Sequence, residues 1–388
     1  MKTINQNNQD LIIIGGGIMG LMTAYFASNF ADNITILEKR VIGKDNKEAA
    51  SFSYTRSIRS DYPDPLYTRF ANEAQGLWRE LQVKSNKKFY IDCGCINLSK
   101  SSVTPDINET YAGKSYKTRT ELNLATQMLT KSELKKRFPQ FEVDYGSLEK
   151  TGGFLLLQVV LESLLKLLKQ KKVTIKENIN IRSIKEEKEN VIIKTQNQTF
   201  ISKKVVVTAG LKTNDLISLI EGNNLTFPLT PDRPQENKYF YPPDDIFEMF
   251  LPEKLPVFAY LDVGIYGHPI FDKKKKALKI GYYNPPDFDW KQDKISSVND
   301  FINTCLPVLK NVPSEDVNDV DQCSYDLVDD DNFIIGKLPK YNNIIIGTGW
   351  RGTGFKFAPL VGKILSQLAL QDGTVYDIEQ FKTERFVK

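Results

Sequence analysis

The chain has 388 residues, more than a single hydrophobic core usually organises, so we expect two domains. The 52 basic and 48 acidic residues leave a formal net charge of +4, which is too small to indicate a nucleic-acid-binding protein. The polar first ten residues lack the apolar run of a secretory signal, and the most apolar window, residues 154–168, is too short to span a membrane. Four cysteines without a regular framework fit a reducing compartment, so we expect a cytoplasmic protein.

Residues 11–38 combine the patterns of a strand, a glycine-rich turn, a helix and a second strand. The apolar run 11–14 enters a G-x-G-x-x-G motif, helical spacing follows over 21–30, and a second apolar run ends at Glu38. Glycines allow a tight turn and a close approach to a pyrophosphate, a helix N-terminus attracts phosphate, and an acidic residue accepts hydrogen bonds from ribose hydroxyls. We therefore expect a site for either FAD or NAD(P), formed by Gly15, Gly17, Ile18, Met19, Gly20, Glu38 and Lys39.

Helical and strand patterns alternate in the next part of the chain. Thr130 and Glu133 form a capping box that predicts a short helix ending near Pro139. Longer helical patterns cover residues 67–81 and 158–170. Strand patterns occupy residues 89–98, expected to form a strand pair, and then 173–175, 191–195, 199–201 and 205–207. Just after the last run, at Gly210, the backbone could approach a cofactor again.

The composition changes twice in the second half of the chain. Residues 221–325 are rich in proline and aromatic residues, which indicates strands joined by irregular connections. After Tyr325, a βαβ-like pattern returns, with strand patterns at 333–336 and 344–349 and a helix from Pro359 to Leu370. Nucleotide-binding elements thus lie at both ends and in the middle of the chain. This arrangement is typical of FAD-binding two-domain oxidoreductases, whereas NAD dehydrogenases usually keep a contiguous dinucleotide domain.

The predicted fold class is α/β (an α+β two-domain protein). A Rossmann-like FAD-binding domain made of discontinuous segments is joined by a mainly antiparallel-sheet substrate domain. The boundaries expected for the FAD-binding domain are 1–85, 146–220 and 326–388. The substrate domain is expected to comprise 86–145 and 221–325.

Four later motifs carry a more specific signal. They are T-R-S-I-R at 55–59, L-K-I-G-Y at 278–282, C-S-Y-D-L-V-D-D-D-N-F-I-I-G at 323–336, and G-W-R-G-T-G-F-K-F at 349–357. Together with the first glycines, and in the same order, they resemble the motifs of the monomeric sarcosine oxidase family. Its relatives include sarcosine, pipecolate, N-methyltryptophan and fructosyl-amino-acid oxidases. The resemblance covers nearly the whole chain.

The resemblance implies roles for individual residues. Cys323 would form a thioether to the flavin, Arg59 and Lys356 would bind the substrate carboxylate, and Lys279 would lie where dioxygen is reduced. A guanidinium with a second cation suits a carboxylate, and a lysine stabilises the negative charge of developing superoxide. Other residues implied near flavin or substrate are Arg56, against the isoalloxazine, and Tyr266 and Tyr325, in the substrate pocket. The expected cofactor contacts in the last third of the chain are Gly349, Gly352, Gly354, Phe355 and Lys356.

The chain departs from the family pattern at several positions. Thr353 and Tyr283 stand where histidines are usual, and Trp350 and Arg351 replace Phe-Ser. Arg351 adds a cation near the pocket or the flavin edge, which could suit a bulkier or more acidic substrate. Its charge could equally meet the pyrophosphate or solvent.

No metal site is expected. The acidic group at 326 and 329–331 lacks the spacing of a calcium loop, so we interpret it as turn and cap residues. Cys93 and Cys95 have no second cysteine pair for zinc. A single histidine, His268, argues against a Ser-His-Asp hydrolase.

The sequence therefore predicts an FAD-dependent amine oxidase, with FAD attached through Cys323. It would act on a secondary or N-substituted amino acid and use O2, giving an imine and hydrogen peroxide. Two alternatives are a dehydrogenase of the same fold that passes electrons to a carrier, and a non-catalytic flavin-binding protein. The expected partners are the small-molecule substrate and O2, without nucleic acid or membrane, in a monomer or small homo-oligomer.

Overall fold

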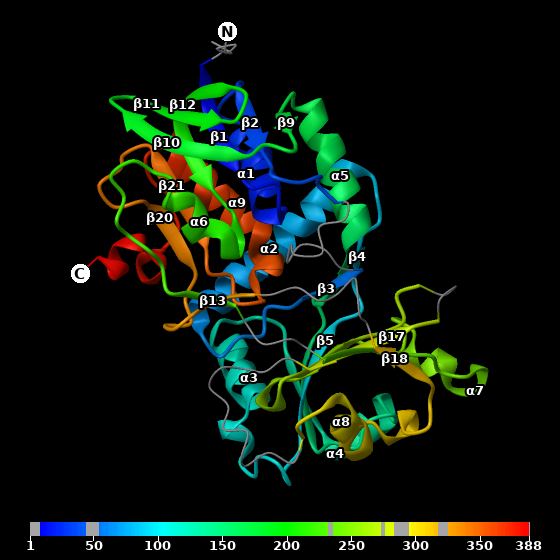
Figure 1. Cartoon of the computed structure of the whole chain (residues 1–388). Coiled ribbons are helices and arrows are strands. Elements are labelled where there is room, and N and C mark those ends of the chain that lie inside the picture. The colour runs from blue at the N-terminus through cyan, green and yellow to red at the C-terminus, as the bar shows by residue number, and fades with distance from the viewer. Residues whose placement is uncertain are drawn as a thin grey trace. The chain divides into compact units, whose positions relative to one another are not determined.

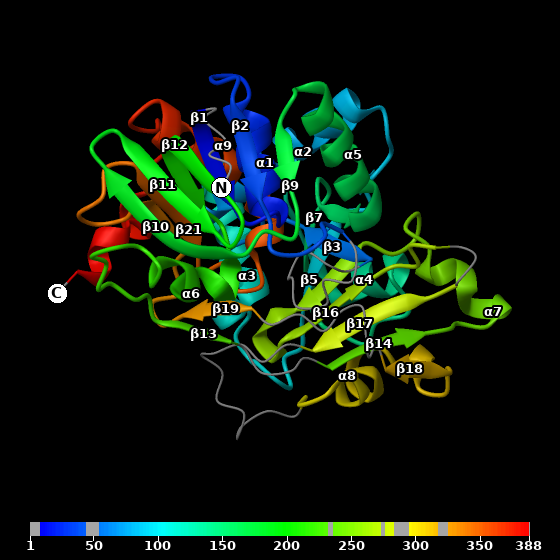
Figure 2. The same cartoon turned by 45° about the horizontal axis from the view of Figure 1, so that its top comes forward.

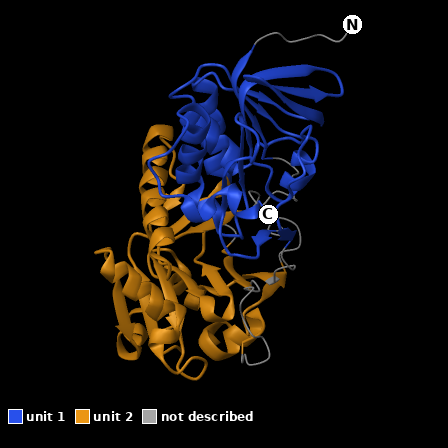
Figure 3. Cartoon of the chain, turned by 90° about the vertical axis from the view of Figure 1, so that its left-hand side faces the viewer, with its two compact units in different colours: residues 1–52, 158–232, 323–388 blue, residues 53–157, 233–322 orange. Residues whose placement is uncertain are grey.

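The computed structural model describes residues 8–43, 54–231, 236–272, 276–282, 295–316 and 325–387. The chain forms two compact units, coloured separately in Figure 3. Unit 1 comprises residues 1–52, 158–232 and 323–388, and unit 2 comprises residues 53–157 and 233–322. Cys323 and Tyr283 lie outside the described residues.

Unit 1 is built on a sheet whose centre is parallel (Figure 1). The parallel strands, in spatial order, are β21 (Ile344–Thr348), β12 (Thr199–Val207), β1 (Gln9–Ile14), β2 (Ile34–Leu37) and β9 (Thr174–Lys176). Residues 11–14 are all buried, as expected of a parallel strand covered on both faces. The antiparallel strands at the margin are β10 (Ile181–Glu187), β11 (Asn190–Thr195) and β20 (Ile334–Lys337).

Two expectations about these strands were wrong. The runs 199–201 and 205–207 are one strand, β12, in which Lys203 projects outward and pairs with Asp10. The segments 333–336 and 344–349 form an antiparallel hairpin of β20 and β21 instead of a βαβ unit. A second, two-stranded sheet in unit 1 pairs β13 (Leu229–Pro231) with β19 (Asp326–Val328).

The α-helices described in unit 1 are α1 (Ile18–Ala27), α5 (Leu157–Gln170, of which residues 158–170 belong to this unit), α6 (Thr213–Ile217) and α9 (Gly354–Leu370). Helix α6 was not predicted, and α1 and α9 start earlier than the sequence pattern indicated. Helix α1 begins directly after Gly17, so Gly20 lies inside the helix. Helix α9 begins at Gly354 and contains Pro359 in its interior. The two helices pack closely, because a Cβ atom on Gly362 would lie 2.6 Å from Met22.

Unit 2 contains a larger sheet that is mostly antiparallel. In spatial order its strands are β18 (Ser314–Asp316), β14 (Glu236–Phe240), β17 (Leu278–Tyr282), β16 (Ile265–His268), β15 (Val257–Tyr260), β5 (Cys95–Ser99), β7 (Tyr145–Glu149) and β6 (Gln127–Thr130). Only β5 and β15 are parallel neighbours among these described strands. Figure 2 shows β14, β16 and β17 as adjacent arrows.

A small sheet and five α-helices also belong to the described part of unit 2. The small sheet has the order β3 (Thr55–Ile58), β8 (Gly153–Leu156) and β4 (Tyr90–Ile91). The helices are α2 (Pro65–Ser85), α3 (Tyr111–Glu121), α4 (Lys131–Arg137), α7 (Asp244–Phe247) and α8 (Val298–Cys305). The capping box of Thr130 and Glu133 at the start of α4 is confirmed. The strand pair expected at 89–98 was wrong, since β4 and β5 belong to different sheets.

The boundaries of the two units differ from the domain boundaries expected from the sequence. Residues 53–85 and 146–157 fall in unit 2, because β3 pairs with β8 and β7 pairs with β5. Residues 221–232 fall in unit 1, because β13 pairs with β19. Which unit serves FAD and which serves substrate stays a prediction. Within the described ranges, every helix is too short or too polar to cross a membrane.

Candidate functional site

The turn between β1 and α1 is closed so tightly that glycine is required. Gly15 has φ +110°, its N–H donates to Leu37 O at 2.9 Å, and a Cβ atom there would lie 2.5 Å from Thr208 O. On Gly20 a Cβ atom would lie 1.9 Å from Gly15 O. The backbones of β1, α1 and the end of β12 therefore meet without room for side chains. In the described residues no side chain caps α1, so its N-terminus suits a pyrophosphate.

Glu38 holds this turn from the end of β2. One carboxylate oxygen accepts from Gly16 N at 2.6 Å, and the other accepts from Arg40 N at 2.9 Å. The carboxylate therefore lies beside the glycine turn, as a ribose-binding acid must. Lys39 is exposed. Buried Ile18 and Met19 form the first turn of α1 next to it.

Gly210 lies after β12 and is linked to β21. It has φ +54°, and its carbonyl accepts from Thr348 Oγ1 at 3.1 Å. Among the described residues, none comes within 4 Å of a Cβ atom built on Gly210, so it is the positive φ that favours glycine here. The ends of β1, β12 and β21 thus bring three predicted cofactor segments to the same edge of the unit 1 sheet.

The segment after β21 is fastened by Asp326. The Asp326 carboxylate accepts from Gly349 N at 2.8 Å and from Thr348 Oγ1 at 3.2 Å, and its own carbonyl accepts from Arg351 N at 3.2 Å. Burial raises the pKa of Asp326 to about 6, an effect that the N–H groups of Trp350 and Gly349 partly offset. The interpretation of Asp326 as a turn or cap residue was wrong, because it is a buried residue of β19.

Glycines in the segment after β21 leave room for aromatic side chains. Gly349 and Gly352 have φ of +74° and +68°, and a Cβ atom on Gly352 would lie 2.3 Å from the ring of Tyr325. A Cβ atom on Gly354 would approach Trp350 to 2.5 Å and Met19 to 3.0 Å. The structure therefore brings the first and last predicted cofactor motifs together within unit 1.

Lys356 and Phe355 lie in the first turn of α9. Both side chains are about nine-tenths buried, at 8% exposure each. Lys356 Nζ donates to Thr353 O at 3.1 Å and lies 5.9 Å from the centroid of the Phe357 ring. Their contacts with flavin or substrate stay predictions.

Arg351 has a partner inside its own turn. It adopts a left-handed conformation with φ +51°, its Nη1 donates to Asp331 O at 2.6 Å, and its Nη2 forms an ion pair with the Asp331 carboxylate. This charge is therefore compensated locally. A contact of Arg351 with substrate stays a prediction.

In unit 2, Arg59 is buried with a carboxylate already beside it. Its Nη1 donates to Asp61 Oδ1 at 2.7 Å, to Asp61 O at 3.1 Å and to the Tyr111 hydroxyl at 3.1 Å. The guanidinium also lies 4.7 Å from the centroid of the Tyr62 ring. Burial raises the pKa of Asp61, and the charge of Arg59 opposes that rise. Arg56, on β3 just before Arg59, donates from Nη1 to Thr55 O at 3.1 Å.

Lys279 and Tyr266 lie together on one face of the larger sheet. Lys279 is 2% exposed, and its Nζ lies 5.7 Å from the centroid of the Tyr266 ring. The Tyr266 hydroxyl donates to Asn237 Oδ1 at 2.8 Å. A Cβ atom on Gly281 would lie 2.4 Å from the Tyr266 ring, so the L-K-x-G-Y glycine makes room for this tyrosine.

Several polar residues around Arg59 were not predicted from the sequence. Asp61 and Ser60 directly follow Arg59, and Ser60 donates from both N and Oγ to Glu149 at 2.8 Å. Glu149 also forms an ion pair at 3.5 Å with Arg119, and both side chains are 1% exposed. No local pattern distinguishes Arg119 or Glu149 from surface charges. Asp61 did have a sequence signal, because the pair Ser60-Asp61 directly follows the T-R-S-I-R motif at 55–59.

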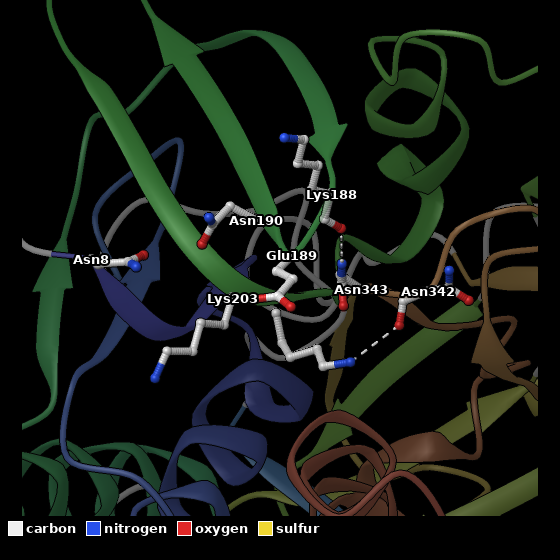
Figure 4. Close-up of a pocket in the computed structure, with 8 residues that line it drawn as sticks. Asn8, Lys188, Glu189, Asn190, Lys203, Asn342 and Asn343 are labelled. Carbon is white, nitrogen blue, oxygen red and sulfur yellow. Dashed lines mark hydrogen bonds between the residues drawn. The ribbon is translucent and has the colours of Figure 1, made fainter.

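A surface pocket of about 460 Å³ lies on unit 1 and is lined by none of the residues discussed above as predicted site residues (Figure 4). Its lining is polar and consists of Asn8, Lys188, Glu189, Asn190, Lys203, Lys204, Asn342 and Asn343. We assign the pocket no role in the chemistry.

Comparisons with known proteins agree with the resemblance that the motifs indicated. Human peroxisomal sarcosine oxidase is 28% identical over 393 residues, covering 97% of this chain and 96% of the relative. Monomeric sarcosine oxidase from an Arthrobacter species is 26% identical and covers 98% of this chain and 97% of its own. The crystal structure of L-proline dehydrogenase from P. horikoshii shares the fold, with a TM-score of 0.78, 19% identity and 98% of each chain covered. A model described as FAD dependent oxidoreductase matches residues 10–368. The chain therefore belongs to the FAD-dependent oxidoreductase family.

Proposed function

We propose that this protein oxidises a secondary or N-substituted amino acid to an imine, which water then hydrolyses. Bound FAD supplies the hydride acceptor, and hydrogen peroxide forms when dioxygen reoxidises the flavin. The observation that carries the proposal is the similarity to two sarcosine oxidases over 96% or more of every chain compared. The chain has Arg56, Arg59, Lys279 and Lys356 at the positions where the resemblance implies that flavin and substrate are bound.

Unit 1 would hold the FAD. The crowded Gly15 and Gly20 backbones, the uncapped N-terminus of α1 and the Glu38 carboxylate fit a dinucleotide, because they offer N–H donors for a pyrophosphate and an acceptor for a ribose. We propose that Gly210, Gly349, Gly352, Gly354 and Phe355 contact the rest of the cofactor.

The substrate carboxylate would bind to Arg59 and Lys356. In the described residues, the hydrogen bonds recorded for Arg59 all start from Nη1, so Nε and Nη2 remain for a carboxylate. A planar guanidinium can hold one carboxylate on each edge. The resemblance further implies that Tyr266 and Tyr325 contact the substrate and that Arg56 lies against the flavin. Fixing the carboxylate orients the reacting C–H bond, which is the positioning part of catalysis.

Lys279 would stabilise the negative charge that develops as dioxygen is reduced. Its burial against Tyr266 supports this role, because a charge in a low-dielectric site acts more strongly than one in water. A lysine on a solvated hairpin would have no such effect. The role distinguishes an oxidase from a dehydrogenase of the same fold.

We also propose that FAD is attached covalently to Cys323. The support is the spacing of Cys323 to Tyr325, Asp330 and Phe333. We expect the flavin to stay with the unmodified protein after acid precipitation. In Cys323→Ser the flavin should be released into the supernatant. Release of flavin from the unmodified protein would exclude the thioether.

The central experiment follows flavin absorbance and peroxide by stopped-flow under anaerobic and then aerobic conditions. The substrates are sarcosine, pipecolate, proline, N-methyltryptophan and fructosyl amino acids. An oxidase is reduced by one of them and reoxidised rapidly by dissolved air. Reduction followed by sluggish reoxidation would indicate the dehydrogenase alternative instead.

Four variants sharpen this experiment. Lys279→Met should slow reoxidation at least tenfold, while Lys276→Met, which removes an exposed lysine paired with Asp244, should leave it unchanged. Unchanged turnover in Arg59→Ala and Lys356→Ala would contradict their role in binding the substrate carboxylate. An unmodified protein whose flavin is reduced by none of these substrates would favour the non-catalytic alternative. A cytoplasmic location and a monomer or small homo-oligomer stay predictions from the sequence.

A further inference from the structure

His268, the only histidine of the chain, links the two sheets of unit 2. Its Nδ1 lies 2.6 Å from Thr55 Oγ1, and its Nε2 lies 2.7 Å from Ser57 Oγ. The ring is 1% exposed and stacks on Phe154, with centroids 5.9 Å apart and planes inclined by 12°. His268 belongs to β16 of the larger sheet, whereas Thr55 and Ser57 belong to β3 of the small sheet.

These hydrogen bonds use the full capacity of a neutral imidazole. A neutral ring has one N–H donor and one acceptor nitrogen, and a hydroxyl can serve either. One hydroxyl must therefore donate to the ring while the other accepts from it. A doubly protonated ring would add a second positive charge beside Lys279, the residue directly opposite His268 on β17.

The link joins the segments that carry the predicted chemistry of unit 2. Thr55 and Ser57 flank Arg56 on β3, and Arg59 follows two residues later. On the other side, Lys279 faces His268 across the β16–β17 pair, and Tyr266 lies two residues before His268 on the same face. The Tyr266 and His268 ring centroids are 5.9 Å apart. The His268 ring thus connects β3, which carries Arg56, to Lys279 and Tyr266.

We propose that His268 is a positioning residue that fixes β3, which carries Arg56 and ends directly before Arg59, relative to Lys279. It acts through Thr55 and Ser57 and does not touch the reacting atoms. The proposal rests on the proposed function for the roles of these partners. A purely packing role would need only the ring stacked on Phe154, which phenylalanine could supply equally well.

The experiment separates the ring from its hydrogen bonds in the FAD-loaded, full-length protein. His268→Phe keeps the aromatic ring and removes both bonds, whereas Thr55→Val and Ser57→Ala each remove one. Ser202→Ala is the matched control, because it removes a buried hydroxyl that bonds only within unit 1. The rate measured is the reoxidation by dioxygen of photoreduced flavin, which requires no amino acid substrate.

We expect His268→Phe to slow reoxidation about tenfold, the effect of about 1.4 kcal/mol, with Thr55→Val and Ser57→Ala each slower than the unmodified protein. Adding Thr55→Val to His268→Phe should slow reoxidation little further, since both substitutions remove the same hydrogen bond. Wild-type reoxidation in Thr55→Val/Ser57→Ala and in His268→Phe would overturn the proposal. Ser202→Ala should reoxidise normally.

A second measurement tests the link without any reaction. The ¹⁵N signals of the single imidazole should show one protonated and one unprotonated nitrogen. Thr55→Val should move mainly the Nδ1 signal and Ser57→Ala the Nε2 signal. Signals unaffected by both variants would also overturn the proposal. Absence of amino acid oxidation in the unmodified protein would instead refute the proposed function, because neither the photoreduction assay nor the ¹⁵N signals require a substrate.

Discussion

Asp326 should make the stability of the protein depend on pH in an unusual direction. Burial raises its pKa from 3.8 to about 6, so between these pH values the folded protein holds a proton that the unfolded chain has lost. Stability therefore falls as the pH rises through this window, because ionising the buried carboxyl costs free energy. Most native aspartates, whose pKa is lowered by folding, act in the opposite sense.

The magnitude follows from the two pKa values. At 1.36 kcal/mol per pH unit, moving the pKa from 3.8 to about 6 corresponds to about 3 kcal/mol once the pH exceeds 6. Asp326→Asn removes the titration and keeps a carbonyl oxygen for Gly349 N. The stability of the variant minus that of the unmodified protein should therefore increase by about 2 to 3 kcal/mol between pH 4 and pH 8.

Urea unfolding followed by tryptophan fluorescence, with saturating FAD at each pH, measures this difference. Any effect of the amide that does not depend on pH cancels when the pH values are compared. Asp329→Asn, at an exposed position three residues along, is the control for a carboxyl in water. A difference between protein and variant that stays constant from pH 4 to pH 8 would refute the reasoning.

Further predictions concern the glycine turn and the buried arginine. Gly20→Ala should abolish FAD loading, because its Cβ atom would lie 1.9 Å from Gly15 O. The ratio of flavin to protein absorbance measures the loading, and full loading of the variant would contradict this prediction. Gly76→Ala, where a Cβ atom meets no described atom within 4 Å inside α2, should instead raise stability by about 0.5–1 kcal/mol. Asp61→Asn should lower the free energy of unfolding by roughly 3 kcal/mol, since it leaves Arg59 buried without its carboxylate. A loss well under 1 kcal/mol in urea unfolding would show that the pair is not a buried ion pair in solution.

Local signals in the sequence predicted much of unit 1 and several helices. The apolar run before the glycines became β1, and the capping box of Thr130 placed the start of α4, because each feature is decided by neighbours within a few positions. The four later motifs, together with the first glycines, indicated the family. Asp326 was misread for the same reason. Its neighbours 329–331 do form a turn, but its own burial results from pairing with β13, almost a hundred residues earlier.

What the sequence could not supply depends on contacts between distant segments. Nothing near residues 90–99 shows that β4 pairs with β8 while β5 pairs with β7 and β15. The ion pair of Arg119 with Glu149 and the bonds of His268 to β3 likewise join residues 30 or more than 200 positions apart. The motifs of the resembled family therefore marked Arg59 and Lys279 as candidate site residues, but the side chains that hold them were not recognised.

The position of β12 has a consequence for how the chain acquires its fold. β1 is made first, yet its neighbour β12 follows after about 190 residues, and β21, which pairs with β12, comes more than 130 residues later still. Helix α9, the packing partner of α1, is later again. The glycine turn must therefore wait, with its apolar strand incompletely paired, until almost the whole chain has left the ribosome. A chain ending before β21 would lack both elements, so we expect C-terminal truncation to remove flavin binding although the glycine motif itself is intact.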